Sequence, residues 1–178
     1  MVTITEATAT DTAILELQLG RVPRGVIGIA NRCVCGAPRV VATKPRLEDG
    51  TPFPTMFYLT HPAAVKGCST LEAGKWMETL NQMLADDAEL RAGYEAAHKH
   101  YIQTRDEVEE VPEIKDFSAG GMPTRVKCLH AILGHALAAG AGVNPIGDLL
   151  IERLVTDKLW DPVTCSCNHG ETPTDLTK

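Results

Sequence analysis

The sequence lacks any apolar run that approaches the roughly 20 residues a membrane-spanning helix needs. Its first residues, MVTITEATATDT, contain neither the positive segment nor the apolar segment of a signal peptide. Internal repeats and low-complexity tracts are also missing, which argues against a repeat architecture. We therefore expect a cytoplasmic protein that has no membrane association.

Aromatic residues are scarce, at 4% of the chain, and the formal net charge is −6. Proteins that bind nucleic acids usually combine a basic surface with stacking aromatic side chains, so we consider nucleic acid an unlikely partner. Acidic residues are absent from one stretch, because every charged residue from Arg21 to Arg46 is basic. This stretch is either an ordinary solvated surface or a basic face for an anionic partner.

The remaining composition, with 44% apolar and 22% charged residues in 178 positions, is typical of one soluble globular domain. A helix at 10–19 precedes three strands at 24–33, 39–44 and 55–60. Their short links favour an antiparallel meander, since a parallel pair would need a long crossover. Helical patterns then follow at 62–73, 75–85, 88–105, 123–139 and 145–160. We predict an α+β fold, with a small antiparallel three-stranded sheet covered by five to six helices.

This single domain is expected to span residues 1–160 and to be followed by a polar, flexible tail at 161–178. The tail contains Cys165-Ser-Cys167-Asn-His169, whose spacing resembles that of metal ligands. Because the motif lies past the last helix beside Pro and Thr residues, we interpret it as adventitious or dispensable.

One predicted helix combines a cysteine with two histidines, in the stretch MPTRVKCLHAILGHALAAGAG from Met122 to Gly142. The helix begins at Pro123 and is apolar on all sides, which indicates burial between two layers. His130 shares a face with leucines and is expected to pack in the core. Cys128 and His135 share another face but lie about 10 Å apart along the axis, a separation that disfavours joint ligation of one ion by a straight helix. The helix alone is therefore weak evidence for a metal site.

The meander brings reactive residues from three segments to one end of the sheet. Cys33 ends the first strand, Cys35 follows it and His61 follows the third strand, so all three lie at the same end. Cys128, from the buried helix, is a natural further member. The predicted metal ligands are Cys33, Cys35, His61, Cys128 and His130. Such a thiolate and imidazole set suits zinc or, alternatively, an iron–sulfur cluster.

Two other interpretations of the six cysteines stay open. In the first, Cys128 is a catalytic or redox thiol with His135 as its partner, and nearby Lys127 lowers the pKa of the thiol. In the second, the cysteines are small hydrophobic residues that only fill the core. A disulfide framework is not expected in the cytoplasm.

A second predicted site binds anions. The segment SAGGMPTR places two glycines just before a helix N-terminus, where free backbone N–H groups favour anions. The alternative is a flexible entry loop whose glycines only serve turn geometry. The predicted anion-binding residues are Arg32, Arg39, Gly120, Gly121, Arg125 and Lys127.

Three blocks of the sequence resemble a known family. They read GRVPRGVIGIANRCVCGAP, PRLEDGTPFPTMFYLTHP and SAGGMPTRVKCLHAILGHALAAGAGVNPIGD. They are similar to the signature blocks of the bacterial domain-of-unknown-function family 501, well represented in actinobacteria, over residues 18–152. Relatives commonly have cysteine at the position of His61, which the resemblance implies is a metal-ligand position, whereas the position of Cys35 is often another residue. The family is uncharacterised and implies no activity.

Two functions therefore compete. The first is a metal- or thiol-dependent enzyme that acts on a small anionic, phosphate-type substrate held by the basic residues. The second is a non-catalytic, metal-stabilised module that recruits a protein partner. The number of ligands separates them, because a catalytic zinc keeps an open position and a structural zinc is closed.

Overall fold

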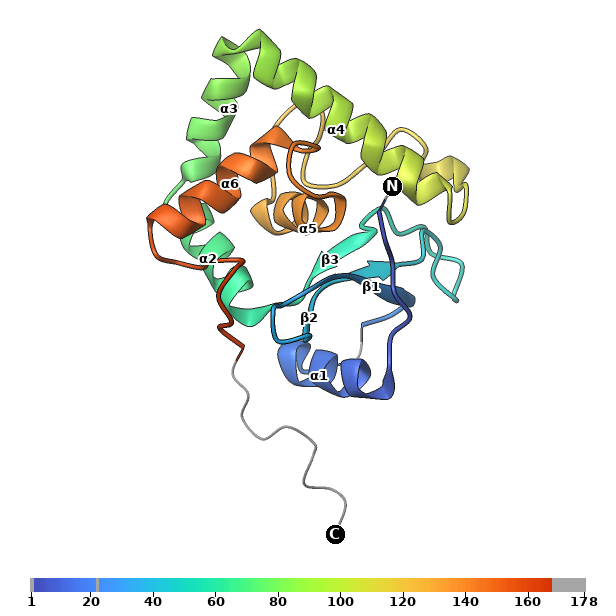
Figure 1. Cartoon of the computed structure of the whole chain (residues 1–178). Helices are drawn as coiled ribbons and strands as arrows, with labels where there is room; N and C mark the ends of the chain where they lie inside the picture. Colours follow the sequence, from blue (N-terminus) through green and yellow to red (C-terminus); the bar gives the residue numbers. More distant parts are fainter. Residues whose placement is uncertain (1, 22, 168–178) are drawn as a thin grey trace.

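The structure, a computed structural model, describes residues 2–21 and 23–167. Its sheet consists of β1 (Val26–Arg32), β2 (Pro38–Thr43) and β3 (Phe57–Leu59), which are antiparallel and adjacent in that order (Figure 1). The described residues also form six α-helices, namely α1 (Ala9–Leu19), α2 (Pro62–Ala73), α3 (Trp76–Asp86), α4 (Ala88–Asp106), α5 (Leu129–Ala139) and α6 (Pro145–Thr156). The predicted α+β fold with a three-stranded meander is confirmed.

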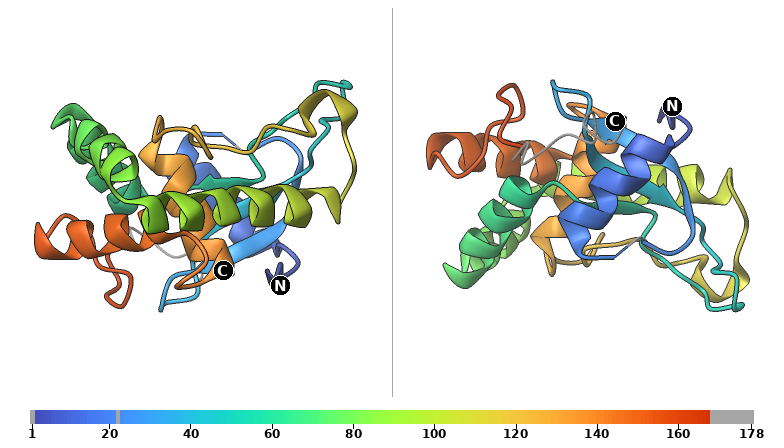
Figure 2. Two further views of the ribbon diagram at one scale, coloured as in Figure 1. Left: turned by 90° about the horizontal axis from the view of Figure 1, so that it is seen from above. Right: turned by 90° about the horizontal axis from the view of Figure 1, so that it is seen from below.

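The sheet is covered on both faces, because α1 lies against one face and α5 against the other (Figures 1 and 2). Val41 on the central strand β2 packs with Ile29 and with Leu15 of α1. Its neighbours Val40 and Ala42 belong to the larger core around α5. This alternation is the period of two that a strand imposes on its side chains.

Helix α5 is the centre of the larger core. Leu129, Ile132 and Leu133 are fully buried on it, in agreement with the prediction of a helix buried between layers. Gly134 allows the closest approach to the sheet, since a Cβ atom there would lie 2.7 Å from the carbonyl oxygen of Phe57. Helices α2 and α6 pack against α5, and α3 and α4 pack in turn against α2 and α6 (Figures 1 and 2).

The predicted start of this helix at Pro123 is wrong, since α5 begins at Leu129. The side chain of Asn81 accepts a hydrogen bond from the N–H of Val126 at 2.7 Å and donates one to its carbonyl at 3.0 Å. The N–H groups of the next two residues donate to the carbonyl of Gly120. These tertiary hydrogen bonds satisfy backbone groups that a longer helix would have used, and they override local propensity.

The chain after α6 returns to the end of the sheet where β1 meets β2. Trp160 is buried, and the guanidinium of Arg39 lies over its ring at 5.6 Å from the centroid. Arg39 also donates a hydrogen bond of 2.8 Å to the carbonyl of Pro162. Of the helices in the described part of the chain, none is both long and apolar enough to cross a bilayer.

Candidate metal centre

Four cysteines from two distant segments meet at this end of the sheet. Cys33 and Cys35 lie in the turn between β1 and β2, and Cys165 and Cys167 lie in the segment after α6. Their four sulfur atoms are all within 4.8 Å of one another. A tetrahedral zinc ion with bonds of about 2.3 Å would place its sulfur ligands about 3.8 Å apart. The cluster can therefore hold a metal ion.

The first pair is fixed by the tight connection between β1 and β2. The N–H of Cys33 donates to the carbonyl of Ala37 at 2.8 Å, and the N–H of Gly36 donates to the carbonyl of Cys33 at 2.8 Å. Gly36 has a φ of 92°, a left-handed conformation that glycine adopts without strain. This turn keeps both cysteines at the end of the two longest strands.

Arg39 is a cation that acts on the cluster. Its side chain is buried, and its Nε atom has no hydrogen-bond partner within the described residues. We predicted Arg39 as part of an exposed anion-binding surface, which is wrong because residues after α6 cover it. The positive charge of Arg39 acts on the cluster instead and helps to lower the pKa of Cys33.

The thiols of the cluster affect one another. Burial alone would raise the pKa of Cys33, but hydrogen bonds from the Cys35 backbone and from the Cys167 and Cys35 thiols outweigh it and lower this pKa to about 7. Burial raises the pKa of Cys35, against which the Ala37 backbone and the Cys167 thiol act. Burial and the Cys35 and Cys33 thiols raise the pKa of Cys167. A metal ion, which binds cysteine as thiolate, would offset the mutual repulsion of several thiolates in such a cluster.

His61 lies beside the cluster, as the meander predicted, but its orientation is that of a hydrogen-bond donor. It is the N-cap of α2, and its Nδ1 atom accepts the N–H of Ala64 at 3.4 Å. Burial, followed by the charge of Arg39, lowers the pKa of His61. The proton of the neutral ring is then on Nε2, which is 3.3 Å from the Cys167 sulfur. Nε2 of His61 thus faces the Cys167 sulfur as a donor, and the group of four ligand atoms does not include His61.

Cys128 and His130 do not join this centre. They form a separate cluster with Glu72 of α2, in which the thiol, a ring nitrogen and a carboxylate oxygen lie within 4.8 Å of one another. The five predicted metal ligands are therefore divided between two places. The reason is the late start of α5, which turns Cys128 at its N-cap toward α2.

His130 is half-buried rather than packed in the core. Its Nδ1 atom is 3.2 Å from the Glu72 carboxylate and 3.9 Å from the Cys128 sulfur, and its Nε2 atom is 3.2 Å from the carbonyl of Val65. The hydrogen bond between Cys128 and His130 is the largest cause that raises the pKa of His130 and lowers the pKa of Cys128. This cluster is partly open to solvent.

His135, which we predicted as the catalytic partner of Cys128, is fully buried on another face of α5. Its Nδ1 atom is 3.2 Å from the Asn144 amide and its Nε2 atom is 3.1 Å from Nδ1 of His100. Burial lowers its pKa to about 3, so the ring is neutral at physiological pH. These contacts give His135 a structural role in the core.

The predicted anion site loses its geometric basis. Gly120 and Gly121 precede turns and an extended stretch, not a helix N-terminus, and the carbonyl of Gly120 accepts two backbone N–H groups. Arg32 forms two hydrogen bonds, of 2.6 and 3.0 Å, with the buried carboxylate of Asp11. Arg125 and Lys127 are exposed, and anion binding by them stays a prediction.

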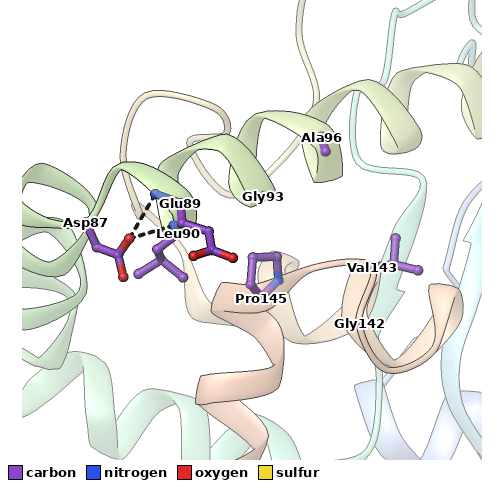
Figure 3. A pocket seen from close by; sticks show the side chains of 8 residues that line it. All are labelled: Asp87, Glu89, Leu90, Gly93, Ala96, Gly142, Val143 and Pro145. Carbon is purple, nitrogen blue, oxygen red and sulfur yellow. Dashed lines mark hydrogen bonds between the residues drawn. The ribbon is translucent and has the colours of Figure 1, made fainter.

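A hollow of about 400 Å³ lies between α4 and the start of α6 (Figure 3). Its charged side chains are Asp87 and Glu89, and the Asp87 carboxylate accepts two N–H groups at the start of α4. Elsewhere the wall consists of Gly, Ala, Leu, Val and Pro residues. This hollow lies where two helices pack together, and its lining, within the described part of the chain, contains no cysteine, histidine or serine.

The second cysteine pair belongs to the candidate centre, although we predicted that its motif is adventitious or dispensable. Two Cys-x-Cys motifs with the same spacing, at 33–35 and 165–167, are visible in the sequence and indicate a four-thiol site when they are considered together. His169 of the same segment lies outside the described residues.

A family model described as "protein of unknown function (DUF501)" matches residues 29–152, about two thirds of the chain. This segment contains Cys33, Cys35, Glu72, Cys128 and His130, whereas Cys165 and Cys167 lie beyond it. No curated protein and no solved structure matches the chain.

Proposed function

The chain belongs to the DUF501 family of proteins of unknown function, and we propose that it binds one zinc ion through Cys33, Cys35, Cys165 and Cys167. The observation that carries this proposal is the approach of all four sulfur atoms to within 4.8 Å. The ion fastens the segment after α6 to the end of the sheet. In this proposal the protein is a cytosolic module whose fold is stabilised by the metal.

A single ion suits these distances better than the iron–sulfur cluster that we also considered. In such a cluster the cysteines bind different iron atoms, so the cluster itself holds their sulfur atoms apart. In the tetrathiolate site of a single ion, each sulfur is instead about 3.8 Å from the other three. The distance of 3.6 Å between the sulfur atoms of Cys35 and Cys167 agrees with this value.

Arg39 supports the proposal through its charge. A buried arginine is costly unless an anionic group lies near it. Four thiolates around a divalent ion leave a net charge of about −2, which a buried guanidinium stabilises. The unpartnered Nε atom of Arg39 and its effect on the pKa of Cys33 are consistent with such a centre.

Four thiolates close the coordination shell, so this centre favours recruitment of a protein partner over catalysis. Val34 lies between the first two cysteines and is 62% exposed, and Val163 precedes the second pair and is 77% exposed. The metal brings these apolar side chains to one end of the molecule. We propose that this end contacts a protein partner.

The test is metal analysis of full-length protein purified without chelators under reducing conditions. We expect Cys167→Ser to lose one equivalent of zinc relative to the wild type. Cys68→Ala, which changes a buried thiol on α2 outside the cluster, is the matched control and should retain all metal. Removal of the metal should also increase hydrogen exchange at residues 33–37 and 161–167. Equal metal contents in Cys167→Ser and the wild type would rule out this centre.

A further inference from the structure

We propose that Glu72, Cys128 and His130 form a second metal site, with three protein ligands and one open coordination position. Its ligands come from other parts of the chain than those of the four-cysteine centre, because this site joins α2 to the start of α5. All three residues lie within the segment that matches the family. The four-cysteine centre depends on two residues beyond that segment.

The interatomic distances fit one ion. For bonds of 2.0–2.3 Å in a tetrahedral arrangement, a nitrogen and an oxygen ligand lie about 3.3 Å apart, and a nitrogen and a sulfur ligand about 3.6 Å apart. In the structure Nδ1 of His130 is 3.2 Å from Oε1 of Glu72 and 3.9 Å from Sγ of Cys128. An ion can therefore bind all three atoms after side-chain shifts of a few tenths of an ångström.

The neighbours of His130 select the ring nitrogen that would bind the ion. Nε2 is 3.2 Å from the carbonyl of Val65 and 3.2 Å from the hydroxyl oxygen of Ser69. The Ser69 hydroxyl donates its own proton to the Val65 carbonyl, so both oxygens accept from Nε2. With an ion bound, the single ring proton would be on Nε2, and Nδ1 would direct its lone pair at the ion. Histidine ligands of metals commonly donate their other N–H to a carbonyl in this way.

Glu72 is held in place by the helix that it faces. Its Oε1 atom accepts the N–H of Leu129, the first residue of α5, at 2.7 Å. A hydrogen-bonded carboxylate is a usual feature of metal sites, because the hydrogen bond fixes its orientation. Two of the ligands are on rigid helices and the third is the N-cap of α5, which gives the site a preorganised geometry.

The fourth position is accessible from solvent. The side chain of Glu72 is 26% exposed and that of His130 is 28% exposed. A metal with three protein ligands and an accessible fourth position binds water or an oxygen atom of a small anion. This site, and not the four-cysteine centre, is therefore the place where metal-assisted hydrolysis by this chain would occur.

Cadmium-113 NMR of the full chain, reduced, stripped with chelator and reloaded with two equivalents of cadmium, tests the second site. We expect two resonances, because each thiolate ligand moves the resonance downfield. His130→Gln should remove only the upfield resonance, and Cys167→Ser should remove only the downfield one. Cys68→Ala should keep both. A wild-type spectrum that contains the upfield resonance but not the downfield one would reject the four-cysteine centre and support the second site.

Alkylation of Cys128 by iodoacetamide, followed by mass spectrometry, gives an independent result. The second equivalent of metal should protect Cys128 at least about tenfold in rate in the wild type, and should not protect it in His130→Gln. A wild-type protein that shows one resonance only, from four thiolates, and unprotected Cys128 would overturn the proposal. The cluster would then be a pair of thiolate and imidazolium without metal.

Discussion

The Nε2 atom of His61 lies 3.3 Å from the sulfur atom of Cys167, although 106 residues separate them in the sequence. This contact joins the start of α2 to the segment after α6. His61 also caps α2 through Nδ1, so one ring serves both the helix and the thiol cluster. With the proposed zinc ion bound, this orientation would make His61 a donor to the Cys167 thiolate, an interaction that tunes a metal site without occupying a coordination position.

The substitution His61→Asn separates the two roles of this ring. Asparagine retains the N-cap of α2 but is too short to reach Cys167. We expect one equivalent of zinc to stay bound to the four-cysteine centre, with an affinity about 10- to 100-fold lower in competition with a chromophoric chelator. Complete loss of that equivalent would show instead that His61 is a ligand.

Arg39→Met tests the role of charge at the same centre. Methionine retains packing volume over Trp160 but removes the buried cation that stabilises the thiolates. We expect zinc to dissociate from the four-cysteine centre about tenfold faster, measured by transfer to a chromophoric chelator. Arg46→Met is the matched control, because Arg46 pairs with Glu113 at the surface. Equal dissociation rates in the two variants would contradict the proposed role of Arg39.

The sequence was sufficient to predict the sheet and one side of the four-cysteine centre. Strand pattern and short links predict a meander, and a meander places Cys33 and His61 at one end. The return of the chain after α6 depends on the burial of Trp160 and on the Arg39 contacts, which are long-range. No local pattern reveals such contacts, so Cys165 and Cys167 were assigned to a dispensable tail.

The roles of the two histidines on α5 are the reverse of the predicted ones, for a related reason. His135 is buried in the core, and His130 is the histidine beside Cys128. The prediction assumed a helix from Pro123, whereas hydrogen bonds from Asn81 on α3 hold residue 126 outside the helix. A helical pattern also does not say which of its apolar faces meets the polar side chains of α2. Glu72 was therefore not predicted as the partner of His130.

Tyr101→Phe tests the polar contacts within the core. The hydroxyl of Tyr101 is buried, accepts the N–H of Met56 at 2.6 Å and donates to the carbonyl of Pro54 at 3.2 Å. Phenylalanine leaves both backbone groups without this partner, so we expect the free energy of unfolding to fall by about 1–3 kcal/mol. Urea denaturation measures it, with Tyr58→Phe on a less buried side chain as control. A change below about 0.5 kcal/mol would indicate that water replaces the hydroxyl.

The buried His135 should make stability depend on pH. Its pKa is about 3 in the folded protein because of burial and the neighbouring His100, against 6.5 for an exposed histidine. Between about pH 6.5 and pH 3, His135 binds a proton in the unfolded chain but not in the folded protein. The stabilisation is therefore complete above pH 6.5 and falls as the pH decreases toward 3, by at most about 1.4 kcal/mol per pH unit.

The comparison of wild type with His135→Gln isolates this contribution, since glutamine does not titrate and the other histidines are common to both. Urea denaturation of the reduced, chelator-treated proteins between pH 7.5 and 4.5 avoids the separate effect of acid on metal binding. We expect the wild type to lose its advantage over the variant as the pH falls through this range. A constant difference in the free energy of unfolding would mean that His135 is protonated in the folded core.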